Sequence, residues 1–222
     1  MRKKLNAILL LILLVLLSCG AGCTDSGRFA VSGKTGTLGL GGEFTTAVTS
    51  NINARIGINA LDLDLEYELD DIEYDIGLDF SSFSALLDWH IFDSPFRISG
   101  GVLSMNHNLD LSASATGEQE IGGVEYDWND IGTLSGSVEI DNVAPYVGIG
   151  WGNPLTGNKR WGFTCDFGVA FAGSPAVALS ATGMASDQVF QADLERERRD
   201  MEDELEDFKF YPVISISFFY RF

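Results

Sequence analysis

The sequence predicts an all-β fold: a closed antiparallel transmembrane β-barrel of eight strands, with one acidic helix in its last exterior loop. Three observations lead to it. The chain begins with a segment typical of an export signal, later segments alternate apolar with polar or small residues, and the connections alternate between short and long. The 222 residues suffice for one closed sheet, and 25 glycines with 11% aromatic residues suit strands joined by turns.

The export signal is the first element. Three cations at positions 2–4 precede an almost unbroken apolar run over residues 5–17. That run is short for a membrane-spanning helix and has the right length for the core of a signal peptide. We therefore predict a signal peptide at residues 1–23 and an outer-membrane barrel at 24–222.

Charge and cysteines narrow the function classes. The formal net charge is −18 and becomes −21 without the signal, so nucleic acid, which needs clustered Lys and Arg, is not an expected partner. Cleavage after Cys23 leaves Cys165 alone, and no intrachain disulfide can form. An alternative reading is a lipobox ending at Cys19, with that cysteine lipidated.

The C-terminal strand has the clearest pattern. One face is wholly apolar, with aromatic residues at both ends, as lipid and its two interfaces require; it consists of Phe208, Phe210, Pro212, Ile214, Ile216, Phe218, Tyr220 and Phe222. The intervening residues are mostly polar. An aromatic residue at the C-terminus, here Phe222, is typical of chains read by the outer-membrane assembly machinery, which we expect as a partner.

The same alternation recurs upstream, over 161–171 and 143–151. It makes Cys165 a lipid-facing residue. Pairing Trp151 with Trp161 across the short turn would place Tyr146 opposite Asp166 inside the barrel. Earlier strands are less regular: the alternation changes phase near Ala60-Leu61 and again near Ser81-Ser82, which we interpret as β-bulges.

The connections give the topology. Short ones at 49–52, 92–96 and 152–160 are placed in the periplasm, and exterior loops are expected at about 68–72, 114–141 and 173–207. An even strand number requires a first strand near 29–34, followed by a tight exterior turn at 35–37.

Two exterior loops are expected to be structured. Residues 120–125 predict a small hairpin around Gly122-Gly123. Residues 186–207, with ten acids and three arginines, predict a helix. The helix either lies solvated on the exterior rim or binds a partner.

Alternation also assigns a polar set to the lumen: Glu43, Arg55, Asp62, Asp64, Asp75, Asp79, Asp88, His90, Arg97, Asp110, Tyr146, Asp166, Lys209 and Arg221. The candidates for a solute path are Glu43, Arg55, Asp62, Asp64, Asp88, His90, Tyr146, Asp166 and Arg221. Because eight strands enclose an interior that side chains can fill, a packed polar plug competes with an open path.

Eight acids between Asp62 and Asp75 form the strongest charge cluster: Asp62, Asp64, Glu66, Glu68, Asp70, Asp71, Glu73 and Asp75. We expect most of them on the inner side of a hairpin above the membrane. There they could attract small cationic solutes, hold divalent ions that bridge lipopolysaccharide phosphates, or keep the rim soluble.

Catalysis is poorly supported. His90 lies two residues from Asp88, which could indicate a hydrolase dyad, but a hydrogen-bonded lumen histidine near the periplasmic turn explains it better. Two histidines and one mature cysteine do not give the spacing of a metal cluster. We expect no catalytic residue, no cofactor and no metal.

The succession of motifs resembles the CarO-type outer-membrane proteins. It consists of GTLGLGGEF at 36–44, an Ile-Gly-Gly exterior hairpin, APYVGIGWGNP at 144–154, WGFTCDFGVAFAGSPAVALSATG at 161–183, an acidic helical insert, and FYPV at 210–213. The resemblance covers nearly all of the mature chain. It implies a small porin-like eight-stranded barrel proposed as a passive uptake route for basic amino acids such as ornithine, and for carbapenems.

Two hypotheses follow, with an outer-membrane hydrolase as a distant third. The first is a passive uptake route for small, cationic, ornithine-like solutes. The second is a non-transporting structural or surface-interaction barrel with acidic exterior loops. Both expect a monomer whose partners are the lipid bilayer and lipopolysaccharide.

Overall fold

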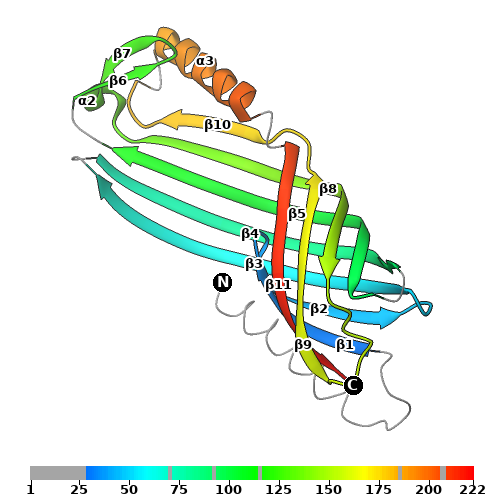
Figure 1. Ribbon diagram of the computed structural model, residues 1–222. Coiled ribbons are helices and arrows are strands. Elements are labelled where there is room, and N and C mark those ends of the chain that lie inside the picture. The colour runs from blue at the N-terminus through cyan, green and yellow to red at the C-terminus, as the bar shows by residue number, and fades with distance from the viewer. Residues whose placement is uncertain (1–28, 70–71, 92–93, 115–116, 185–186, 206–208) are drawn as a thin grey trace.

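A computed structural model of the chain describes residues 29–222 except 70–71, 92–93, 115–116, 185–186 and 206–208. The expected signal peptide lies outside these residues. Eight antiparallel strands close into a barrel (Figure 1): β1 (Phe29–Gly36), β2 (Gly39–Ala47), β3 (Ile52–Leu69), β4 (Ile72–His90), β5 (Phe96–Ser114), β8 (Leu134–Trp151), β9 (Trp161–Phe171) and β11 (Phe210–Arg221). The predicted first strand is thus confirmed.

The sheet order is β10-β8-β5-β4-β3-β2-β1-β11-β9, and a pairing between β8 and β9 closes the barrel. β8 divides its partners: residues 146–151 pair with β9, whereas residues 134–139 pair with β10 (Ala176–Ala181). β10 therefore belongs to the sheet but lies beyond the closed part. None of the described helices is long and apolar enough to cross a bilayer.

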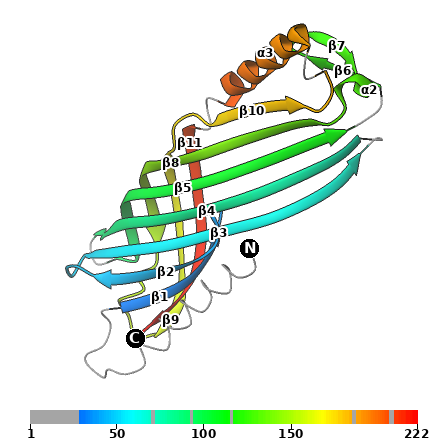
Figure 2. The same ribbon diagram turned by 180° about the vertical axis from the view of Figure 1, so that it is seen from behind.

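Strand length differs sharply around the barrel. β3, β4, β5 and β8 have 18 or 19 residues, whereas β1, β2, β9 and β11 have 8 to 12. Nineteen residues span roughly 60 Å, about twice the ~30 Å hydrocarbon core of a bilayer. The long strands continue past the barrel on one side, as Figure 2 shows. We call this continuation the exterior sheet: residues 61–69, 72–80, 107–114 and 134–140 together with β10.

The register is continuous through the long strands. β3 pairs with β4 from Ile52↔Trp89 to Leu69↔Ile72, and β4 with β5 from Glu73↔Ser114 to His90↔Arg97, without an extra residue. The expected β-bulges at Ala60-Leu61 and Ser81-Ser82 are therefore wrong. At these positions the strands leave the bilayer, so the surroundings of their two faces change.

One row of paired residues marks the change: Ala60, Ser81, Asn106 and Asp141. Below this row the outward side chains are apolar and exposed, as in Ile56 (52%) and Leu87 (56%), while the inward ones are buried and mostly polar. That distribution is the reverse of a water-soluble barrel and matches a wall in contact with lipid. Large aromatic side chains such as Trp151, Trp161 and Phe163 complete the belt.

Above the row the faces exchange character. The inner face carries Leu61, Leu63, Leu65 and Tyr67 on β3, next to Phe80, Leu78, Ile76 and Tyr74 on β4. The outer face carries the acids Asp62, Asp64, Glu66, Asp75, Asp79, Asp110 and Glu139, all exposed. The inward placement expected for Asp62, Asp64, Asp75, Asp79 and Asp110 is thus wrong, because alternation continues unbroken while the solvent changes.

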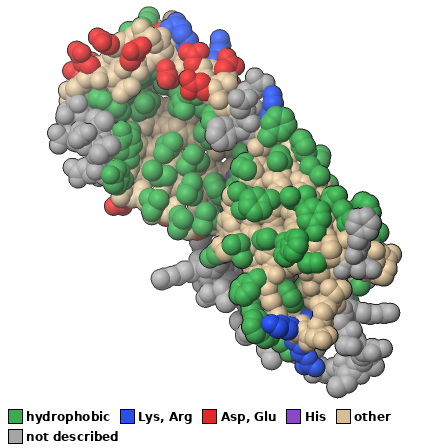
Figure 3. Space-filling model, viewed as in Figure 1, with side chains coloured by type: hydrophobic (Ala, Val, Ile, Leu, Met, Phe, Trp, Pro, Cys, Tyr) green, Lys and Arg blue, Asp and Glu red, His purple; other side chains and the backbone are tan. Residues whose placement is uncertain are grey.

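A cap of four elements covers part of the inner face: β6 (Glu118–Ile121), β7 (Val124–Asp127), α2 (Trp128–Ile131) and α3 (Gln188–Glu204). Its core consists of Ile121, Trp128, Ile131, Phe190 and Leu194, packed against Ala113, Leu134, Leu179 and Ala181 of the exterior sheet. Figure 3 shows α3 with its acids above the hydrophobic inner face.

The predicted hairpin is confirmed, with Gly122 and Gly123 at positive φ of 57° and 82°. The predicted helix is confirmed as α3, whose first turn is capped by the Asp187 carboxylate accepting from the backbone N–H groups of Val189 and Phe190. The loop expected at 114–141 is shorter, because β8 already begins at Leu134.

Candidate functional site

The lumen of the barrel contains a charged network centred on Arg55, which is 3% exposed. Its Nε lies 2.6 Å from Asp88 Oδ2 on the neighbouring strand. Nη1 donates to both oxygens of Glu43 at 3.3 Å and to Asp166 Oδ2 at 3.2 Å, and Nη2 donates to Asp166 Oδ1 at 3.2 Å and to Ser99 Oγ at 3.2 Å. One guanidinium therefore bridges β2, β4, β5 and β9 across the barrel.

Arg97, 1% exposed, adds a second bridge. Its Nη2 donates to Asp166 Oδ1 at 2.7 Å, its Nε lies 3.7 Å from Asp88 Oδ2, and its Nη1 donates to the carbonyl of Gly152. The Ser99 hydroxyl donates to Asp88 Oδ1 at 2.6 Å. Lys34 Nζ completes the set 3.7 Å from Glu43 Oε2. Three cations thus face three anions, which buried charges require.

Glycine makes room for this network at one position. A Cβ at Gly150 would lie 2.8 Å from Arg97 Nε and 2.8 Å from Asp166 Oδ1. Gly150 pairs directly with Asp166 and with Arg97 on its two sides. The ion pair between Arg97 and Asp166 therefore occupies the space that a side chain at position 150 would take.

Neutral polar groups line the periplasmic end of the lumen. Asn53 Nδ2 lies 3.1 Å from His90 Nε2 and donates to Asn153 Oδ1 at 3.2 Å, and His90 Nδ1 lies 3.3 Å from the carbonyl oxygen of Ser94. The prediction of a hydrogen-bonded lumen histidine is confirmed. Asp88 turns instead to Ser99 and Arg55, so it does not form a dyad with His90.

An apolar layer lies above the charges. It consists of Leu38, Leu86, Leu103, Met105, Ala144, Tyr146, Ala170, Ala172 and Val213, all at most 6% exposed. Tyr146 fits because Gly148 and Gly168 flank its ring: a Cβ on either would lie 2.3 or 2.4 Å from the phenol oxygen. Leucine and methionine here provide no partner for a polar solute.

The expected pairing of Tyr146 with Asp166 is wrong. Trp151 pairs with Cys165 instead of Trp161, so Tyr146 lies opposite Ala170. β9 begins four residues below the end of β8, since Trp161 pairs with Tyr220 at the end of β11. Such a stagger is part of the shear that closes a barrel.

Aromatic rings form the top of the lumen. The His107 ring stacks on Phe80 at 4.5 Å and meets Tyr211 edge-on at 5.3 Å, between centroids. Tyr211 in turn donates its hydroxyl to the carbonyl of Thr37 at 2.7 Å. His107 is 3% exposed, and the three rings pack together where the lumen meets the inner face of the exterior sheet.

The remaining predicted site residues lie elsewhere. Asp62 and Asp64 face water on the outer side of the exterior sheet, and Arg221 is at the rim, where its Nη2 donates to the carbonyl of Gly157 at 2.6 Å. The sequence reasoning missed Lys34, Ser99, Asn53 and the apolar layer. Inward alternation of Ser99 with Arg97 could have identified the serine.

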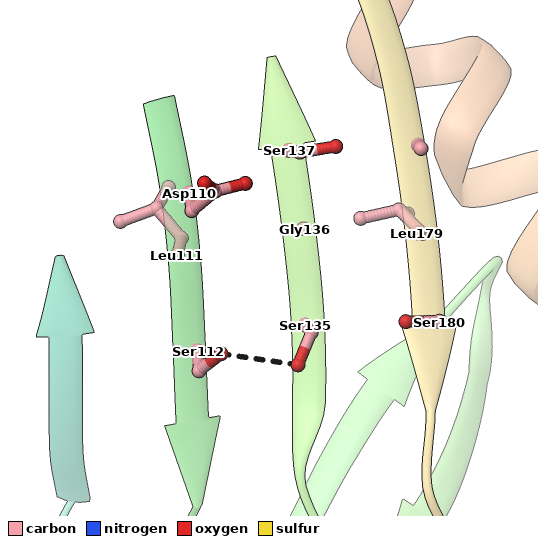
Figure 4. Close-up of a pocket in the computed structure, with 9 residues that line it drawn as sticks. Asp110, Leu111, Ser112, Ser135, Gly136, Ser137, Leu179 and Ser180 are labelled. Carbon is pink, nitrogen blue, oxygen red and sulfur yellow. Dashed lines mark hydrogen bonds between the residues drawn. The ribbon is translucent and has the colours of Figure 1, made fainter. Parts of the chain in front are cut away.

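The outer face of the exterior sheet has a shallow pocket of about 340 Å³ between β5, β8 and β10. Most of its lining residues are small or polar, and the Ser112 and Ser135 hydroxyls lie 3.1 Å apart (Figure 4). It is lined by Asp110, Leu111, Ser112, Ser135, Gly136, Ser137, Ala178, Leu179 and Ser180. Among the described residues no group of three or more His, Cys, Asp or Glu side chains is placed to hold a metal ion.

Within the cap, polar contacts hold the β6–β7 hairpin to α3. Tyr126 donates its hydroxyl to Asp193 Oδ2 at 2.7 Å, and this hydrogen bond, together with burial, raises the pKa of Tyr126 to about 12. Glu197 accepts from the backbone N–H of Gly122 at 3.0 Å. On the exposed side of α3, hydrogen bonds from Arg198 and Arg199 lower the pKa of Glu195 to about 2.

Two solved structures have this architecture. CarO2 of Acinetobacter baumannii is 18% identical with a TM-score of 0.65, over 90% of this chain and 100% of the CarO2 chain. CarO of the same species is also 18% identical with a TM-score of 0.65, over 88% of this chain and 98% of that chain. By sequence, the chain matches no protein-family model and no curated protein. The closed barrel, its lipid-facing belt and this likeness together identify the chain as an outer-membrane β-barrel with the fold of the CarO barrels.

Proposed function

We propose that the protein is a plugged outer-membrane barrel that works at the cell surface through its exterior sheet and cap, without acting as an open diffusion route. The observation that carries this proposal is the filled lumen. A charge-balanced network and, above it, an apolar layer occupy the interior in series.

The energetics of the two layers support the proposal. A solute passing the network must separate buried ion pairs, and leaving a buried charge without its partner costs roughly 3–5 kcal/mol. A cation that passed would next meet leucine, methionine and alanine side chains, which offer no ligand for its charge.

The competing function is passive uptake of small, cationic, ornithine-like solutes. The observation that favours it is the acidic exterior surface, which raises the local concentration of cations. These acids, however, line the outer side of the exterior sheet and point away from the lumen. Uptake would also require both lumen layers to move aside.

Liposome swelling distinguishes a plugged barrel from an open uptake route. The intact protein is compared with three variants: one that removes four charges of the network (R55S, R97S, D88S and D166S, with no change in net charge), one that replaces two members of the apolar layer by serine (L103S and M105S), and the combination. We expect little ornithine permeation from the intact protein and from either partial variant, because one layer still closes the lumen, and clear permeation from the combination.

Heat-modifiability on gels verifies that each variant has folded before its permeation is read. If the intact protein admits ornithine as fast as the combined variant, the plug proposal is wrong and the uptake route replaces it. Glucose serves as the uncharged comparison, since steering by acids should favour ornithine alone.

A further inference from the structure

The upper half of β3 ends in a free sheet edge. β2 pairs with β3 only as far as Leu40↔Ala60, and from Leu61 to Leu69 the described backbone of β3 pairs with β4 alone. In an antiparallel strand every second residue directs its N–H and C=O toward the missing neighbour. This edge is therefore a template on which another strand can form.

The two edges of the exterior sheet are treated differently by the fold. At the opposite edge, α3 packs against β10, and the Val177 N–H donates to Glu202 Oε1 at 3.4 Å. One edge is thus covered by a helix that supplies an acceptor. The β3 edge has no such cover among the described residues.

Side chains at the β3 edge remain exposed on both faces. On the inner face Leu63, Leu65 and Tyr67 are 43%, 50% and 60% exposed, beside the partly buried Ile76 and Leu78 of β4. A contiguous apolar surface in water usually marks a binding site. On the outer face Asp62, Asp64 and Glu66 are exposed at every second position.

We propose that residues Leu61–Tyr67 of β3 bind an extended peptide segment of a partner, with alternating basic and apolar residues, as an added strand of the exterior sheet. The partner's apolar side chains extend the inner apolar face, and its Lys or Arg side chains lie across from Asp62, Asp64 and Glu66. Backbone hydrogen bonds provide affinity and the alternate side chains provide specificity.

Charge selects this occupant over a second copy of the chain. An antiparallel β3–β3 pairing would bring carboxylates opposite carboxylates on the outer face, and like charges directly opposite destabilise a ladder. Basic residues at the same positions convert that repulsion into favourable cross-strand pairs. The inference rests on the proposed function only in placing the protein's work outside the membrane.

The test uses the full mature chain folded in detergent micelles at about 0.15 M salt, where screening acts over about 8 Å. Fluorescence anisotropy follows three short labelled peptides: one alternating Lys and Val, one alternating Glu and Val, and a Lys-Val peptide with N-methyl groups along one edge. We expect saturable binding of the first alone, because the second has the wrong charge and the third cannot complete the ladder.

Two variants locate the site. D62N/D64N/E66Q removes three acids from the edge strand and should weaken Lys-Val binding by about tenfold or more. D110N/E139Q/D141N removes three acids from the same outer face on β5 and β8, two or more strands away, and should change it less than about threefold.

Several outcomes would overturn the proposal: no saturable binding of the Lys-Val peptide, equal binding of the N-methylated peptide, equal loss in the two variants, or self-association through β3 detected by cross-linking. Each of these is independent of permeation. A plugged barrel that fails to bind leaves the proposed function intact, and a conducting barrel that binds refutes only the plug.

Discussion

At the scale of single residues, the lumen depends on two guanidinium groups that share their acids. Asp166 accepts from both Arg55 and Arg97, and Asp88 contacts both. Because Arg offers several donors in a fixed planar arrangement, a lysine could not replace either bridge. Removing one of these four charged residues therefore takes a partner away from the others.

Arg97→Met should destabilise the folded barrel by roughly 3–5 kcal/mol, since it leaves Asp166 and Asp88 buried with one cation between them. Urea unfolding in lipid vesicles measures the change. The double variant R97M/D166N should cost less than the two single changes together. Arg221→Met, at the rim, should stay within about 0.5 kcal/mol of the original; a similar loss there would contradict the buried-network argument.

At the scale of elements, the main finding is that a long strand can invert its polarity without a bulge. β8 illustrates this, since Val147 faces lipid and Ser137 faces water on the same side of one strand. Only their positions along the strand, relative to the membrane boundary, distinguish these two residues. A hydropathy pattern alone does not show where along the strand that boundary lies.

We expect Val147→Arg to cost roughly 2–4 kcal/mol of barrel stability, because it places a charge in the hydrocarbon. Ser137→Arg should cost almost nothing, since it lies in water with Asp110 beside it. Unfolding curves of the two variants in lipid vesicles measure these two stability costs. Equal costs would mean that the row from Ala60 to Asp141 does not mark the membrane boundary.

The cap should respond to alkaline pH through Tyr126. Its pKa in the folded state, about 12, is above the ordinary value of 10.0, so the hydrogen bond to Asp193 contributes fully below pH 10 and is lost as the pH rises toward 12. Limited proteolysis should cut α3 faster at pH 11 than at pH 9. Tyr126→Phe should already be cut faster at pH 9 and depend less on pH; identical profiles would refute this role.

The sequence predicted β9 and β11 well because each lies in one environment for its whole length. It misplaced Asp62, Asp64, Asp75, Asp79 and Asp110 because a reversal of surroundings and a bulge both shift the alternation by one residue. Six of the nine solute-path candidates do lie in the lumen: Glu43, Arg55, Asp88, His90, Tyr146 and Asp166. Which of them contact one another depends on barrel stagger, which leaves no mark in local sequence.

At the scale of the whole molecule, one continuous sheet serves two solvents. The membrane part turns apolar side chains outward and buries a mostly polar interior, whereas the exterior part turns its acids outward and its apolar side chains inward. The cap covers one end of the exterior inner face and leaves the β3 end open. The molecule thus combines a closed wall with an accessible surface above it.

The inverted strands also bear on how the chain finds its register during assembly. Shifting one strand by one residue sends its whole inward set outward. In β3 or β4 that single error would expose Arg55 or Asp88 to lipid and would also move the acids of the exterior outer face onto the apolar inner face. An ordinary barrel strand is penalised for such a slip only within the bilayer. A slipped strand is here disfavoured both in the membrane part and in the exterior part, so lipid and water both favour the correct pairing.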